Sequence, residues 1–218
     1  MKNGKFAKRG VATKAMVMIL SLMLVIGLSV GGTLAWLTAS TGPVENTFTV
    51  GDITINIWEH DYIPASNTLD ANADPVKKND DYKFVPGATL PKDPYVVVEA
   101  NSEACWLFVT VDAENNANGD VTIVNYTVDS AVWNQVPDEE NVWYTQVSAA
   151  DAAAGKTFNV LANKQVTVSG DVTKTMVNTI NQNKPTLTFK AYAIQSANLS
   201  NAGAAVTDAA VAWALVKP

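Results

Sequence analysis

The stretch GGTLAWLTASTGPVENTFTVGDITINIWE, residues Gly31–Glu59, decides how the chain is organised. It ends an apolar segment, continues as a polar stretch that contains Pro43, and then enters the first strong β-strand pattern. Apolar and polar residues alternate in Thr47–Val50 and again in Ile53–Ile57, as in half-buried strands. The phase of this alternation changes at Gly51. Because a one-residue slip would turn the hydrophobic face over, the sequence predicts a bulge or break there.

The segment before this stretch has the pattern of an export signal. Ala15–Leu28 is a run of fourteen uncharged residues, which suits a signal peptide better than a membrane span of about 20 apolar residues. Thr33 and Ala35 place small residues at the two positions that a signal peptidase reads. We therefore expect residues 1–35 to be a signal peptide with an N-terminal signal helix, cleaved between Ala35 and Trp36. The alternative is an uncleaved anchor that extends through Ser29–Leu37.

The charge of the chain is divided unevenly. Five of the 15 basic residues precede Ala15, whereas none of the 21 acidic residues does. The expected mature chain of 183 residues keeps ten basic residues against 21 acidic ones, a net charge of −11, and has no arginine. Binding to a phosphate backbone needs clustered lysine and arginine, so nucleic acid is excluded as a partner.

After the signal, the sequence predicts a flexible N-terminal arm at residues 36–46 and one β-sandwich domain at residues 47–218. Short apolar runs separated by glycine, proline and asparagine turns indicate antiparallel strands with a few short helices. Residues 59–83 read as a long surface loop. In chain order, the next expected elements are strands at 95–99, 105–111 and 121–128, strands around the acidic turn 137–140, and a capped short helix after Ser148 that Gly155 closes. They are followed by strands at 157–161 and 165–169, a helix within 171–183 and a strand at 186–195. For the terminal segment at 202–216, helix is favoured over strand.

The turn Asn118-Gly119 is the strongest hairpin signal in the chain. It lies between the apolar run 105–111 and the segment 121–128, and it predicts that these two strands form an antiparallel pair.

Few residues suggest chemistry. His60 is the only histidine, and zinc peptidases need two histidines one helical turn apart, so we expect His60 to be solvated in a loop and the chain not to be an enzyme. Cys105, the only cysteine, lies in an apolar run and is expected to be a buried small side chain. The alternating oxygen ligands of Asp112–Asp120 suggest a calcium loop, but the glutamate expected at its twelfth position is missing. No cofactor and no metal are expected.

The quoted stretch also resembles the start of the TasA/camelysin family of exported Gram-positive proteins, in GGTLAW and NTFTVGDITINI. Two later segments are similar to the same family: Val85–Val111, with its Pro-Gly turn and paired strands, and Leu187–Leu199, which resembles the last core strand. The three pieces span most of the chain in the expected order.

The resemblance implies a jelly-roll sandwich, processing by a dedicated signal peptidase, and a role as a secreted subunit of an extracellular fibre or biofilm matrix. It also implies head-to-tail assembly of identical subunits, in which the freed arm of one completes the sheet of the next. Trp36 and Leu37 in the arm, together with Phe48 and Val50 where the strand pattern resumes after it, would carry this contact. Contacts with other matrix proteins stay open. A surface adhesin or carbohydrate-binding module with exposed tryptophans is the alternative, and a camelysin-like metallopeptidase is the third reading.

The export hypothesis predicts a mature N-terminus at Trp36, because cleavage follows the small residues Thr33 and Ala35. N-terminal sequencing of protein from the culture supernatant measures this directly. A chain that begins before Gly31, or full-length protein found only in membranes, would contradict the prediction.

Overall fold

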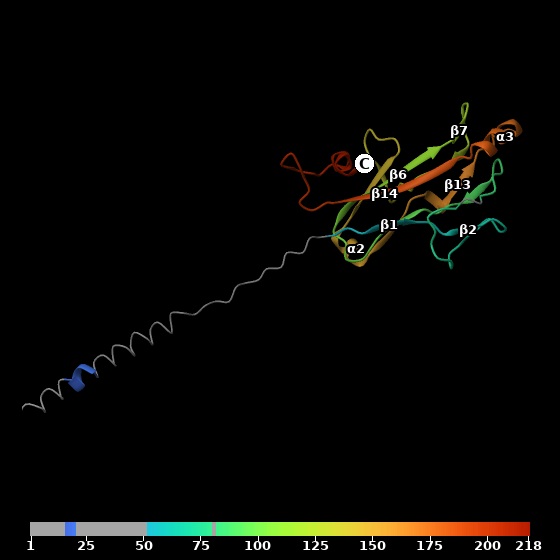
Figure 1. The fold of residues 1–218 in the computed structure, drawn as a ribbon. Helices are drawn as coiled ribbons and strands as arrows, with labels where there is room; N and C mark the ends of the chain where they lie inside the picture. Colours follow the sequence, from blue (N-terminus) through green and yellow to red (C-terminus); the bar gives the residue numbers. More distant parts are fainter. Residues whose placement is uncertain (1–15, 21–51, 80–81) are drawn as a thin grey trace, which may run out of the picture. The chain divides into compact units, whose positions relative to one another are not determined.

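The computed structural model describes residues 16–20, 52–79 and 82–218 (Figure 1). Residues 16–20 are helical with exposed side chains, and the described residues from 52 onward form a separate compact unit. Among all described residues, no helix has the length and apolar character needed to cross a membrane. The predicted cleavage site between Ala35 and Trp36, the arm at residues 36–46 and the expected break at Gly51 lie outside the described residues.

The largest sheet contains four antiparallel strands in the order β10-β11-β6-β14. Their bounds are Asn134–Gln135, Val142–Val147, Cys105–Glu114 and Thr186–Gln195, respectively. β6 and β14 run side by side along their full length of ten residues, with Gln195 opposite Cys105 (Figure 1). β6 is therefore a central strand, and β14 is a long strand at the end of the sheet.

Two three-stranded antiparallel sheets continue one another. Their strands are β1 (Ile55–Trp58), β5 (Tyr95–Val98) and β12 (Lys156–Asn159) in one, and β4 (Thr89–Pro91), β13 (Gln165–Val168) and β9 (Val124–Asn125) in the other. Backbone hydrogen bonds join them end to end: the N–H of Val160 donates to Pro94 O, and the N–H of Lys92 donates to Lys164 O. The two sheets are thus built on the same two chain segments, one that contains β4 and β5 and one that contains β12 and β13.

Among the described residues from 52 onward, the smaller elements are three two-stranded ribbons and four short helices. The ribbons pair β2 (Asp61–Ile63) with β3 (Thr68–Asp70), β7 (Ala117–Asn118) with β8 (Val121–Thr122), and β15 (Ser200–Asn201) with β16 (Ala204–Ala205). The helices are α2 (Ala149–Ala154), the 3-10 helix η1 (Ala162–Lys164), α3 (Lys174–Gln182) and α4 (Ala209–Val216). The unit is mainly β, as the sequence predicted.

Local signals define the helix ends. The Ser148 hydroxyl accepts a hydrogen bond from the N–H of Asp151 and caps α2, whose C-terminal residue is followed by Gly155 at φ 79°. Thr173 caps α3 in the same way. These helices, the strands at 95–98, 105–114, 142–147, 156–159, 165–168 and 186–195, and the helical choice for the C-terminal segment confirm predictions made from the residues alone.

Two hydrophobic cores lie on opposite faces of β6. Leu107, Val109 and Val111 belong to the first core, which they share with β5, β12 and β13. Trp106 and Phe108 belong to a second core, which α4 completes. Successive side chains of a strand point to opposite faces, so β6 is buried on both. Cys105 is fully buried in the first core, as expected, and burial raises the pKa of its thiol to about 11.

The predicted pairing of 105–111 with 121–128 is wrong. The two-residue turn is Gly119-Asp120, and it joins only β7 and β8. Gly119 has φ 61° and Asp120 does not have a positive φ, which fits a turn with glycine at its first position. Beyond this ribbon the chain leaves β6, and Val124 and Asn125 pair with β13. Both edges of β6 are already occupied, by β11 and β14.

Residues 59–83 are not the plain surface loop that the sequence predicted. Within the described part of this segment, β2 and β3 form a ribbon, and Glu59 and Val76 exchange backbone hydrogen bonds. Glu59 and Tyr62 are buried. The segment is therefore packed against the body of the unit.

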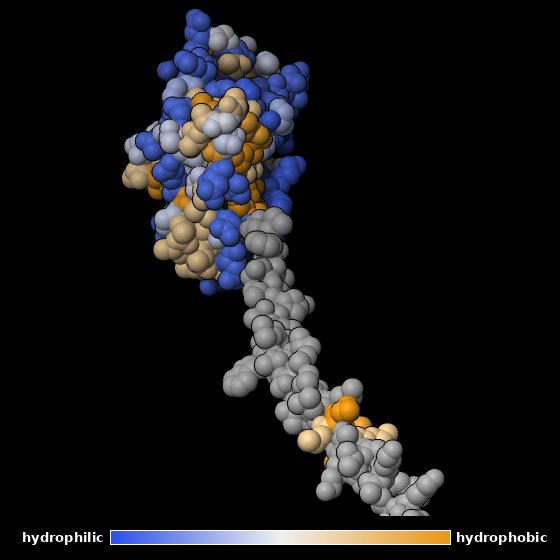
Figure 2. Space-filling view, turned by 90° about the vertical axis from the view of Figure 1, so that its left-hand side faces the viewer, coloured by the Kyte–Doolittle hydropathy of each residue, from blue (hydrophilic) through white to orange (hydrophobic). Residues whose placement is uncertain are grey.

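Some hydrophobic surface remains on the compact unit. Figure 2 shows hydrophobic side chains reaching the surface among hydrophilic ones on one face. Of the large hydrophobic residues described between 52 and 218, Ile63, Val85 and Leu215 are exposed.

Gly155 provides a test of the backbone after α2. A Cβ at this position would lie 3.0 Å from Ala100 N, and φ is 79°. Gly155→Ala is expected to lower the free energy of unfolding by about 1–3 kcal/mol, as measured by urea denaturation. Gly170→Ala is the control, because nothing lies within 4 Å of its added Cβ and its φ is not positive. Equal stability of the two variants would contradict this reading.

Candidate functional site

A buried polar cluster lies where β1 passes into the 59–79 segment. Lys92 Nζ donates to Glu59 Oε2 at 2.7 Å, and the side chains of Lys92 and Glu59 are only 11% and 9% exposed. The ammonium also lies 5.2 Å from the ring centre of Tyr82 and 5.6 Å from that of Phe189. The surroundings of this ion pair are thus aromatic and largely shielded from solvent. Each buried charge therefore needs the other to offset the cost of its burial.

A second pair lies beside the first. Asp93, whose side chain is 3% exposed, receives both of its hydrogen bonds from one residue: the backbone N–H of His60 at 3.1 Å and the ring nitrogen Nδ1 of His60 at 2.7 Å. The imidazole ring also contacts Tyr95, with ring centres 5.4 Å apart. His60 lies outside the strands, as expected, but its side chain is only 26% exposed. The expectation that it is solvated is wrong, since the ring is the partner of a buried carboxylate.

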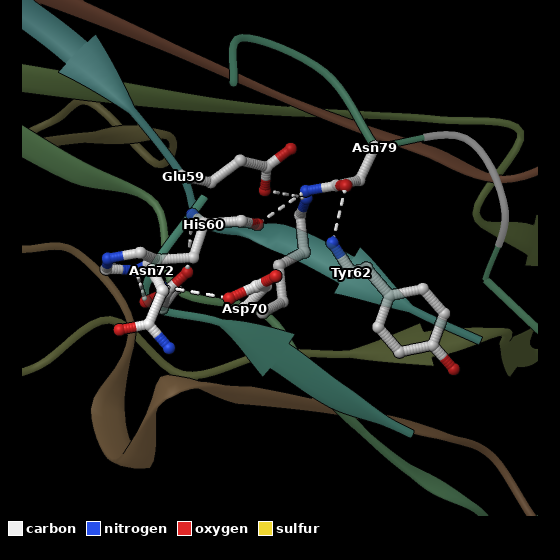
Figure 3. A network of polar contacts seen from close by, with 8 residues as sticks. Glu59, His60, Tyr62, Asp70, Asn72 and Asn79 are labelled. Atoms are coloured by element: carbon white, nitrogen blue, oxygen red, sulfur yellow. Dashed lines mark hydrogen bonds and ion pairs between the residues drawn. The ribbon is translucent and has the colours of Figure 1, made fainter. Parts of the chain in front are cut away.

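Asn79 links this cluster to β2. Its side-chain oxygen accepts from the N–H of Tyr62 at 2.9 Å, and its side-chain nitrogen donates to His60 O at 2.9 Å (Figure 3). Tyr62 stacks on Tyr82 with ring centres 4.3 Å apart. Burial, and then the charges of Glu59 and Asp93, raises the pKa of the Tyr82 hydroxyl above its ordinary value. The cluster therefore fastens the segment to the body by hydrogen bonds at several points.

The cluster is an ion-pair network rather than a ligand set. Glu59 is engaged by Lys92, and Asp93 by His60. Within the described ranges, no three histidine, cysteine or acidic side chains converge as metal ligands would. What this arrangement does chemically is neutralise buried charges in place.

The calcium-loop candidate at Asp112–Asp120 does not converge either. Asp112 pairs with Lys190 at 3.1 Å on the surface. The buried Asn116 uses both atoms of its side-chain amide on the backbone of Val124. The side-chain oxygens of these two candidate calcium ligands are thus engaged in separate structural contacts.

The tryptophans favour the core reading over a carbohydrate-binding surface. Trp106, Trp133 and Trp213 are buried. Trp58 and Trp143 are half-buried, and Lys77 Nζ lies 4.6 Å from the ring centre of Trp58. None of the described tryptophans is an exposed residue. Trp36 lies outside the described residues.

The outer edge of β14 is the most unusual surface of the unit. No strand among the described residues pairs with it, although β14 is ten residues long. Natural sheets protect such edges with short strands, prolines, bulges or charges. β14 has no proline and one charged residue, Lys190, whereas β10 at the other end of the sheet has two residues. β1 lies beside β14, with Cα atoms within 8 Å, and its outer edge is also unpaired among the described residues.

The residues that sequence reasoning assigned to the assembly contact, Trp36, Leu37, Phe48 and Val50, lie outside the described residues, as does Ala35. Sequence reasoning missed both the polar cluster and the free edge of β14. The strand itself was predicted correctly at 186–195, but its place at the end of a sheet depends on pairings that local patterns do not contain.

No family model matches this sequence, and comparison with curated proteins and with solved structures found no similar protein.

The buried ion pair gives a stability prediction with a matched control. Lys92→Met leaves the Glu59 carboxylate buried without its partner, so the free energy of unfolding should fall by about 3–5 kcal/mol in urea denaturation. Lys190→Met removes the exposed pair with Asp112, whose side chains are 54% and 42% exposed, and should cost about 1 kcal/mol or less.

A double variant separates loss of the ion pair from loss of packing. Adding Glu59→Leu to Lys92→Met removes the stranded charge and should recover part of the lost stability. A double variant that is less stable than Lys92→Met alone would show that the pair is not what fastens this segment.

Proposed function

We propose that this chain is a secreted structural protein, a subunit of an extracellular fibre or biofilm matrix that assembles head-to-tail through its N-terminal arm. The observation that carries the proposal is the outer edge of β14, which is ten residues long and pairs with no described strand. A free edge of this kind is a template for strand addition from another chain.

Two features of the sequence support the same function. The first 35 residues have the pattern of a cleaved export signal. The residues quoted above resemble the TasA/camelysin family, whose members include fibre-forming matrix proteins. A head-to-tail contact uses different surfaces on the two partners, so it generates open filaments rather than closed dimers.

The proposed fold is a jelly-roll sandwich. In its support, one core collects side chains from β6 and β14 on one side and from β1, β5, β12 and β13 on the other. Such sharing is what two facing sheets would produce. The partners proposed are other copies of this chain, the export and signal-peptidase machinery, and other proteins of the matrix; the location is the cell surface or extracellular matrix.

The alternatives have less support. A carbohydrate-binding adhesin would need exposed aromatic rings, and the described tryptophans are buried or half-buried. A camelysin-like metallopeptidase would need a set of converging metal ligands, and within the described residues no three histidine, cysteine or acidic side chains come together in that way.

Deletion of the arm tests the proposal. Mature protein lacking residues 36–46 should fold, with an unfolding transition like that of the intact mature chain, but stay monomeric by analytical ultracentrifugation. The intact mature chain should form filaments under electron microscopy, because the arm is the donor strand. Filaments of normal appearance from the truncated protein would rule out the arm as the joint, and a persistently monomeric intact chain would rule out the fibre function.

A further inference from the structure

The pair of Lys92 with Glu59 brings an amine and a carboxyl group together inside the compact unit. Lys92 Nζ lies 2.7 Å from Glu59 Oε2, and the two side chains are 11% and 9% exposed. A contact of this length places Nζ roughly 3–3.5 Å from the carboxyl carbon, which is the separation of atoms that are ready to react. The two groups from which an amide forms are therefore already adjacent.

The backbone on both sides of the pair is held in place. Glu59 and Val76 exchange two backbone hydrogen bonds, of 2.9 and 2.8 Å, and the N–H of Lys92 donates to Lys164 O at 2.9 Å. Groups fixed in this way lose little further freedom when they react. A reaction between them is therefore strongly favoured over the same reaction between separate molecules.

The surroundings of the pair favour a neutral product over two charges. The ring centres of Tyr82 and Phe189 lie 5.2 and 5.6 Å from the ammonium. Water would solvate the separate ions and reverse the reaction, but little of either side chain is exposed to it. Burying two charges carries a solvation cost that is much smaller for an amide.

A second lysine–carboxylate pair serves as a comparison within the same chain. Lys190 Nζ lies 3.1 Å from Asp112 Oδ2, a similar contact, but these side chains are 54% and 42% exposed. Both ions are solvated there, so nothing favours their conversion to an amide.

The neighbouring side chains identify the reacting carboxylate and a hydrogen-bond donor. Both oxygens of Asp93 accept from His60, which leaves Glu59 as the carboxylate for Lys92. The Tyr82 hydroxyl is buried and has no hydrogen-bond partner among the described residues. Burial, followed by the charge of Glu59, raises the pKa of this hydroxyl, so it stays protonated. It is available to donate to the carboxyl oxygen that becomes negative during the reaction.

We propose that Lys92 and Glu59 become joined by an isopeptide bond that the folded chain forms by itself. The ammonium first passes a proton to the carboxylate, which gives an amine and a carboxylic acid. The lone pair of Nζ then forms a bond to the carboxyl carbon. The bond from this carbon to the hydroxyl oxygen breaks, and the hydroxyl leaves as water with one of the two protons on Nζ. No oxidant, cofactor or second protein is consumed.

The bond would fasten the 59–79 segment covalently to the body of the unit. It joins two residues that lie 33 positions apart, so it closes a loop that persists in the unfolded chain. It forms within one subunit, and it is therefore independent of the assembly proposed above.

Mass spectrometry of the denatured mature chain tests the bond without any substitution. The intact mass should be lower than the mass of the sequence by one water molecule. A tryptic digest should contain one branched peptide that joins Lys92 to Glu59, whereas the peptides with Lys190 and Asp112 should be separate. A full intact mass, or a branch from Lys92 to another side chain, would overturn the proposal. A link between Lys190 and Asp112 as well would overturn the role given to burial.

Lys92→Arg is the matched variant. Its guanidinium keeps a positive charge opposite Glu59 but stays protonated and is no nucleophile, so the variant should show the full mass of its sequence. Lys190→Arg is the control and should still lack one water molecule. Loss of water from Lys92→Arg would contradict the assignment. If Lys92→Arg does not fold, the branched peptide from the unmodified chain decides.

Tyr82→Phe tests the donor separately. The substitution keeps the ring beside Lys92 and removes the hydroxyl, so the linked share of newly made protein should grow at least ~10-fold more slowly. Unchanged growth of the linked share would remove the hydroxyl from the reaction and leave the bond itself standing.

Discussion

The burial of β6 on both faces is the constraint on which the rest of the structure depends. Its odd-numbered side chains fill the first core and its even-numbered aromatic residues, Trp106 and Phe108, fill the second. Such a strand needs a partner on each edge and a cover on each face. β11 and β14 supply the edges, the strands around β5 cover one face, and α4 covers the other. The apolar run at Cys105–Val109 is the sequence signature of this position.

The sequence predicted the positions of strands and helices well, but it predicted poorly which strands pair with one another. The reason is physical. The caps at Ser148 and Gly155 and the bounds of β14 follow from residues that are neighbours in the chain. The pairing of β6 does not, because its partners lie far away in sequence and compete with the local turn at Gly119. The polar cluster was missed for the same reason. Lys92 lies 33 residues from Glu59, and neither side chain carries a local sign of burial.

The polar cluster and the free edge of β14 differ in whether their polar groups have hydrogen-bond partners. Around Asp93, two hydrogen bonds satisfy a buried carboxylate, and Asn79 satisfies the backbone of the adjoining segment. Along β14, by contrast, the outward backbone N–H and C=O groups of alternate residues have no partners among the described residues. Because an unprotected edge favours uncontrolled association, a natural strand of this length without proline or bulge calls for an explanation. A dedicated partner strand is the explanation proposed.

A strand that adds to β14 would also change the stability of the subunit that receives it. The edge exists only while β14 is paired with β6, so an added strand binds the folded state and not the unfolded chain. Ligands with that preference stabilise the fold by mass action. Apolar side chains at this edge, such as Phe189, would lose their remaining exposure as well. Assembly and subunit stability would therefore rise together, whereas the polar cluster contributes its stability to monomer and polymer alike.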